Sequence, residues 1–144
     1  MKPKEFINQL EHDRIVAAIH AAEKKTSGEI RVFISRHNPP DAMQAAQARF
    51  AEMGMGKKKE KNGVLIFVAP RAHKFAVIGD SGVHQRCGDE FWRVLAGEMT
   101  GHFKQGKFME GLVHAITKAG ELLAEHFPRH ASDKNELSDE IEHD

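Results

Sequence analysis

Residues 64–79 read VLIFVAPRAHKFAVIG, and this stretch decides the expected fold. Its first part, VLIFVA, is a continuous apolar run, which is typical of a central strand that is covered on both faces of a sheet. PRAHK makes a turn, and FAVIG returns as a second strand, so the two strands are expected to form an antiparallel hairpin.

A third strand and a connecting helix precede this hairpin. Residues 29–35 read EIRVFIS and alternate apolar with polar side chains, which is the period of a strand. Residues 41–53 place Ala46 and Phe50 on one helical face, with Asp41 as the expected cap. The two strands and the helix between them therefore predict a βαβ unit, whose strands are parallel.

Apolar residues at helical spacing predict further helices over residues 11–26, 88–99 and 109–127, whereas residues 80–87 are expected to form a strand-to-helix loop. The predicted order is α-β-α-β-β-α-α. We expect an α/β fold in which a small mixed β-sheet, made of the βαβ unit and one antiparallel hairpin strand, is sandwiched by helices.

The chain is predicted to be one domain with a tail. At 144 residues it is long enough for one well-formed core. Pro128 ends the last predicted helix, so the domain is expected to cover residues 1–128. Residues 129–144 are polar and acidic with few apolar side chains, and we expect them to be disordered.

The composition excludes several classes of protein. Lys and Arg together number 21, as do Asp and Glu, so no strong overall charge favours nucleic acid or a membrane surface. The single Cys excludes an internal disulfide and fits a reducing compartment. The start MKPKEFINQLEHD has no apolar signal segment, and no apolar run approaches the roughly 20 residues of a spanning helix. We expect a cytoplasmic, monomeric protein that does not bind nucleic acid.

Familiar catalytic motifs are absent, including GxxxxGK[ST], GxGxxG, HExxH, GxSxG and CxxC. Cys87 and Arg93 have the C-x5-R spacing of cysteine phosphatases, but the residues between them include two acids and two large aromatics. A phosphate-binding loop needs small residues and no negative charge, and carboxylates beside the thiol would raise its pKa. The sequence therefore argues against a cysteine nucleophile.

Carboxylates around residues 76–92 are the remaining candidates for chemistry. Asp80 follows a predicted strand, Asp89 begins the next predicted helix, and Glu29 starts the first predicted strand. Such oxygen ligands, gathered from loops, suit Ca²⁺ or Mg²⁺. The alternative is that Asp89 caps its helix and Asp80 makes an Asx turn. The residues by themselves leave both readings open.

Two basic features have similar alternatives. His84 lies among these carboxylates and is either a proton donor or an ordinary surface histidine. The lysines of residues 57–61 either meet phosphate or an acidic partner, or form a solvated loop that keeps the next strand from pairing wrongly.

Four segments in register carry a resemblance to a known family: TSGEIRVFIS, ARFAEMGMGKKKEKNGVLIFVAP, KFAVIGDSGVHQRCGDEFW and FKQGKFMEGLVHAITKAGELL. From about Asn8 to Phe127 the chain resembles the TPM-domain family, also called the TPM phosphatase family. It is most similar to the short cytoplasmic branch, which tends to end in a segment like NELSDEI, here residues 135–141. The resemblance implies an α/β sandwich.

The resemblance also implies loops that hold a divalent cation, often calcium, and the acid phosphatase activity described for some relatives. Carried over by position, it points to Asp80 and Asp89 as metal ligands and more weakly to Glu29 and Asn62. Relatives often occur beside LemA-type membrane proteins, which implies a possible adaptor role at the inner membrane face. Here KPKEFINQLEHD replaces an Asp-rich stretch and Lys61 replaces an acid, so cation affinity should be lower.

Two functional hypotheses follow. In the first, the domain is a metal-dependent phosphatase acting on phosphate monoesters: Asp80 and Asp89 hold Ca²⁺ or Mg²⁺, and His84 protonates the leaving group. In the second, the domain is a non-catalytic binding domain, in which a cation only rigidifies loops and the acidic tail and residues 57–61 contact a partner. The residues favour binding, the resemblance favours the phosphatase, and the prediction is a phosphatase-like TPM domain.

Overall fold

The computed structural model describes residues 9–37, 39–55, 62–69, 74–88, 90–128 and 142–143. The elements are α2 (Gln9–Glu23), β1 (Glu29–Ile34), α3 (Ala42–Glu52), β2 (Gly63–Ala69), β3 (Lys74–Gly79), α4 (Ser81–Cys87), α5 (Glu90–Lys104), α6 (Phe108–His126) and β4 (Glu142–His143).

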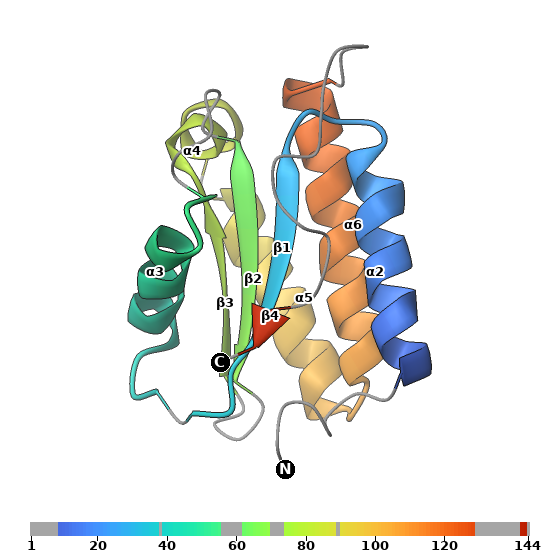
Figure 1. Ribbon diagram of the computed structural model, residues 1–144, viewed down its shortest axis with the longest axis vertical. Helices are drawn as coiled ribbons and strands as arrows, with labels where there is room; N and C mark the ends of the chain where they lie inside the picture. Colours follow the sequence, from blue (N-terminus) through green and yellow to red (C-terminus); the bar gives the residue numbers. More distant parts are fainter. Residues whose placement is uncertain are drawn as a thin grey trace.

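The strands form one mixed sheet in the order β3-β2-β1-β4. β1 and β2 are parallel and are joined through α3, which confirms the βαβ unit. β3 runs antiparallel to β2, which confirms the hairpin. Every residue of β2 is buried, as the continuous apolar run of residues 64–69 predicts. The predicted α/β fold class is therefore confirmed (Figure 1).

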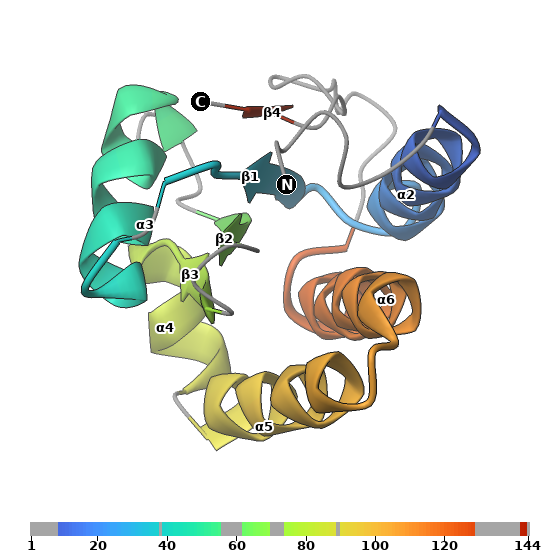
Figure 2. The same cartoon turned by 90° about the horizontal axis from the view of Figure 1, so that it is seen from below.

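Helices cover the two faces of the sheet unequally. Figures 1 and 2 show α3 alone on one face and α2, α5 and α6 on the other. Ile30, Val32 and Ile34 of β1 belong to the core cluster beneath the three helices. Phe33 and Phe67 belong to the smaller cluster beneath α3, where their rings stack with centroids 5.7 Å apart. The alternation of β1 thus divides its side chains between two cores.

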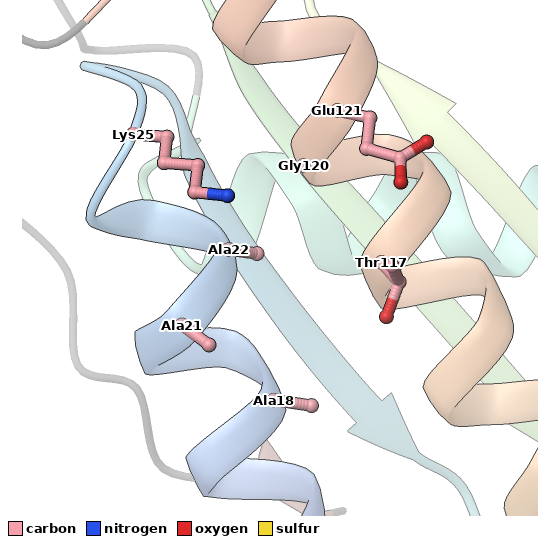
Figure 3. Close-up of a pocket in the computed structure, with 7 residues that line it drawn as sticks. All are labelled: Ala18, Ala21, Ala22, Lys25, Thr117, Gly120 and Glu121. Carbon is pink, nitrogen blue, oxygen red and sulfur yellow. The ribbon is translucent and has the colours of Figure 1, made fainter.

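The first and last described helices, α2 and α6, lie side by side. A Cβ atom added at Gly120 would lie only 2.5 Å from the Cβ of Ala22, so this contact requires glycine. Figure 3 shows that mostly small side chains, together with Lys25 and Glu121, line the groove between the two helices, a cavity of about 190 Å³. The pairing continues past the helices, because the Thr26 hydroxyl and the Ser27 N–H both donate to the carbonyl of Phe127.

The expected strand-to-helix loop is instead the short helix α4. Asp80 caps this helix, and Gly88 ends it with a φ of 75°. Only Val83 is buried among the helical residues, so α4 has no apolar stripe that periodicity could detect. α5 then runs to Lys104, beyond the end predicted at residue 99, and a turn at Gly106 with a φ of 74° leads into α6.

The end of the acidic tail adds to the sheet. Glu142–His143 form β4, which lies parallel to β1 at Phe33 and Ile34. This pairing was not expected from the sequence, because the polarity of residues 129–144 predicts disorder. Residues 129–141 lie outside the described residues.

Among the helices that the structure describes, none combines the length and the apolar character needed to cross a membrane.

Candidate metal site at one end of the sheet

Three segments that are distant in sequence meet at one end of the sheet. Glu29, the first residue of β1, lies in register with Gly63, the first residue of β2. The N–H of Asp80, just after β3, donates to the carbonyl of Gly63 at 2.9 Å. Glu29, Gly63 and Asp80 therefore form a row across three strands, and Asn62 directly precedes its middle member. The backbones of three of the four predicted ligands therefore lie at the same end of the sheet.

Asp89, the fourth predicted ligand, and the lysine loop of residues 57–61 lie outside the described residues.

Two residues at this end of the sheet are fully buried. Glu29 is 2% exposed and Asn62 is 0% exposed. The Asn62 amide donates to the Ser27 hydroxyl oxygen at 3.1 Å, which joins the start of β2 to the loop before β1. Gly28 makes this approach possible, because a Cβ atom there would lie 3.1 Å from the Asn62 carbonyl oxygen and 3.0 Å from the side chain of Leu123.

Asp80 caps α4 with one carboxylate oxygen, and its other oxygen accepts no hydrogen bond from the described residues. Its Oδ1 accepts a hydrogen bond from the Ser81 N–H at 2.7 Å, so Asp80 caps α4, whereas the sequence suggested an Asx turn as its alternative to metal binding. Its Oδ2 is buried and accepts no hydrogen bond from any residue within the described ranges. A buried acceptor without a donor is destabilising, and a bound cation would compensate it.

Glu23 is a buried acid at this end that the sequence analysis did not single out. It is 3% exposed, and its Oε2 accepts a hydrogen bond from the Ile30 N–H at 2.7 Å. It ends α2 four residues after Ile19 and eight after Ile15, which places it on the buried face of that helix. This spacing was the signal in the sequence that could have identified it.

The middle of the row is filled by a side chain rather than left open. A Cβ atom added at Gly63 would lie 3.3 Å from the Cε of Met55, which is itself fully buried. A thioether is a soft ligand and does not suit a hard cation. In the part of the chain that the structure describes, no three His, Cys, Asp or Glu side chains form a ready-made metal site. The donors present are hard oxygen atoms, which fit Ca²⁺ or Mg²⁺ in kind.

His84 lies one helical turn after Asp80, and its N–H donates to the Asp80 carbonyl at 3.1 Å. Its side chain is exposed and lines a groove along β3 together with Trp92 and Arg93. The structure therefore places the predicted proton donor on the same short helix as Asp80, with its imidazole in a neighbouring groove.

Contacts to the end of α6 hold α4 in place. The Arg86 guanidinium donates to the His126 carbonyl at 2.9 Å and lies 4.7 Å from the centroid of the Phe127 ring. Cys87 follows, and burial raises the pKa of its thiol above the ordinary value; Glu125 adds to this rise, and Arg86 opposes it. A raised pKa keeps the thiol protonated, in agreement with the rejection of a cysteine nucleophile.

Comparisons with known proteins agree with this architecture. The family model for the TPM domain matches residues 1–122. The solved structure of the BA42 protein from the psychrophilic bacterium Bizionia argentinensis is 40% identical, with a TM-score of 0.90 and 99% of each chain covered. No curated protein matches the chain.

Two more distant structures share the fold alone. An N-terminal domain from P. gingivalis is 17% identical with a TM-score of 0.65, covering 86% of this chain and 82% of its own. The N-terminal domain of the cg2496 protein from Corynebacterium glutamicum is 16% identical with a TM-score of 0.63. The match covers 81% of this chain and 74% of that domain's chain.

Proposed function

Because this chain belongs to the TPM-domain family, we propose that it is a divalent-cation-binding domain whose site lies where Glu29, Asn62 and Asp80 meet. The observation that supports this most directly is the buried Oδ2 of Asp80, which accepts no hydrogen bond from a described residue. It lies at the end of the sheet to which the register also brings the buried carboxylate of Glu29.

The kind of ligand favours Ca²⁺. The candidate oxygens come from three separate segments, and Ca²⁺ accepts irregular oxygen shells more readily than Mg²⁺ does. Mg²⁺ demands near-ideal octahedral geometry and keeps several waters. A hard cation here would draw the starts of β1 and β2 toward Asp80 and so stiffen the N-terminus of α4.

The test is a titration of the protein with Ca²⁺ and then Mg²⁺, following backbone amide shifts by NMR. We expect saturable shifts centred on Glu29, Gly63 and Asp80. Asp80→Asn should weaken binding about tenfold or more, because cation affinity follows ligand charge. Asparagine caps helices as well as aspartate does, so α4 should persist in this variant.

A matched control removes a charge elsewhere. Glu121→Gln changes net charge by the same amount on the exposed surface of α6 and should leave cation affinity unchanged. Glu29→Gln should reduce affinity as Asp80→Asn does. Equal losses of cation affinity in all three variants would mean that binding depends only on the overall charge of the protein. The absence of amide shifts at millimolar Ca²⁺ would exclude the site.

Hydrolysis of phosphate monoesters is the second candidate, because the family name includes the word phosphatase. A bound cation would polarise a phosphoryl oxygen and the attacking water. The water oxygen would then form a new P–O bond and release a proton to solvent while the ester P–O bond breaks. The leaving oxygen would take a proton, for which His84 is the candidate donor. This requires the ester to reach from Asp80 to the groove that His84 lines.

Hydrolysis of p-nitrophenyl phosphate in the presence and absence of Ca²⁺ or Mg²⁺ tests the second candidate. Cation-dependent turnover that is lost in Asp80→Asn and reduced in His84→Gln would support it. Unchanged turnover in Asp80→Asn would rule out the assignment of Asp80 to the hydrolytic site. Cation binding without turnover would leave the domain as a binding domain.

A further inference from the structure

The outer edge of β3 carries unpaired backbone groups. β3 is the last strand on its side of the sheet, and the Asp80 N–H donates inward to Gly63. Because successive residues of a strand direct their N–H and C=O groups to opposite sides, those of Phe75 and Val77 point away from β2. Nothing in the described part of the chain forms a hydrogen bond with them. Such an edge is a template for another strand.

A groove follows this edge between two helices. Its volume is about 580 Å³, with Met43 and Gln47 of α3 on one side and Trp92 and Ala96 of α5 on the other. The side chains of β3 alternate between the two core clusters, since Val77 packs with one and Ile78 with the other. A strand added here would place its side chains alternately against α3 and α5.

The charged side chains along the groove are basic. Arg93 and His84 line it, and no carboxylate of the described residues does. Lys74 begins β3 at the opposite end and donates to the carbonyls of Pro39 and Pro40 at 3.2 and 2.9 Å. The charges therefore favour an acidic partner.

The opposite edge of the same sheet already shows this mode of binding. Figure 2 shows β4 and β3 at the two ends of the sheet. There the acidic end of the chain, Glu142–His143, adds to β1 as a parallel strand. One edge is therefore covered by an acidic segment and the other has none among the described residues.

We propose that the outer edge of β3 is a docking site for an extended acidic segment of a partner protein, which adds to the sheet as a further strand between α3 and α5. Backbone hydrogen bonds to Phe75 and Val77 provide affinity, and contacts with Trp92 and Met43 select side chains. This inference does not depend on the cation site.

The test uses NMR spectra of the full chain with a synthetic peptide, NELSDEIEHD, which copies residues 135–144. This peptide is acidic, and its end is the segment that adds to β1. We expect saturable shifts of the Phe75 and Val77 amides and of the Trp92 indole. No shift of these groups at several millimolar peptide overturns the proposal, as do shifts confined to Phe33 and Ile34, which would mean exchange with the chain's own β4.

Backbone pairing is tested by methylating the peptide. One peptide carries N-methyl groups on its odd residues and a second on its even residues, with composition and charge unchanged. Strand addition predicts that one of them loses binding and the other retains it, because only one set of N–H groups faces β3. Equal binding of both peptides overturns strand addition.

The charge requirement is tested by reversing one rim residue. Arg93→Glu should weaken binding about tenfold, which corresponds to about 1.4 kcal/mol. Arg14→Glu, an equal change on the exposed surface of α2, is the matched control and should have no effect. Equal weakening of peptide binding by Arg93→Glu and Arg14→Glu would mean that binding depends only on overall charge, which would overturn the proposal. Shifts of the β3 amides on concentrating the protein alone would identify a second copy as the partner instead.

Discussion

The two faces of the sheet differ in chemistry as well as in cover. Toward α2, α5 and α6, β1 presents only Ile30, Val32 and Ile34. Toward α3, the same strand has Phe33 but also the charged side chains Glu29 and Arg31, which are 2% and 5% exposed. Three helices cover the apolar face, whereas α3 packs mainly on β2 and β3.

The two faces of the sheet are therefore expected to differ in role, one contributing stability and the other holding polar groups. Buried apolar area supplies most of the favourable free energy of folding, so the three-helix face carries most of the stability. Buried charges add little net stability, and natural proteins keep them for specificity or function. The α3 face can therefore hold ligand-binding groups at the start of β1 while the opposite core maintains the fold.

The largest expected effect tests where the stability lies. Leu112 of α6 and Met55 beside α3 are both fully buried, and truncation at such sites costs about 2–5 kcal/mol. We expect the loss of unfolding free energy, measured by urea unfolding, to lie near the upper limit of this range for Leu112→Ala. For Met55→Ala we expect it near the lower limit. A larger loss for Met55→Ala would contradict the division between the two faces.

A smaller effect tests how closely the helices of the apolar face pack. In Gly120→Ala the added Cβ meets Ala22, and overpacking of this kind costs about 1–3 kcal/mol, more than the roughly 1 kcal/mol that alanine gains in a helix. Gly97→Ala on α5 is the matched control, since a Cβ atom there meets nothing within 4 Å. The control should stabilise the protein slightly in thermal unfolding; a stabilised Gly120→Ala would mean that α2 and α6 separate easily.

The smallest effect concerns the single helix of the other face. Asp41 caps α3 by accepting a hydrogen bond from the Gln44 N–H at 3.1 Å, and losing such a cap costs about 1 kcal/mol. Asp41→Ala should speed amide hydrogen exchange in α3 and leave exchange in α6 unchanged. Gln44→Ala keeps the cap and serves as the control. Equal acceleration in α3 and α6 would show that the two faces unfold as one unit.

Local patterns predicted the elements that bury an apolar stripe. The run at residues 64–69 identified β2, whose residues are all buried, and the alternation at residues 29–35 identified β1, although both faces of β1 are buried. α4 escaped this reasoning since it buries Val83 alone. β4 escaped it because its pairing depends on a strand more than a hundred residues away, which no local pattern records.

The candidate site was predictable only in part. The resemblance pointed to Glu29, Asn62 and Asp80 as ligands, and the register brings their backbones to one end of the sheet. Sequence could not foresee that Met55 lies over Gly63 or that the His84 side chain lines a different groove. Both depend on how side chains from separate elements pack, which is decided in three dimensions.

The pairing of α2 with α6 has a consequence for synthesis. The Thr26 hydroxyl and the Phe127 carbonyl that it contacts are 101 residues apart, an interval that a ribosome covers in roughly 5–20 s at usual rates of elongation. During that time the emerging α2 lacks the helix on which it packs, and its apolar side chains Ile15 and Ile19 remain uncovered. The domain therefore completes its fold only after α6 has emerged, and until then a chaperone that holds nascent apolar segments would be of most use.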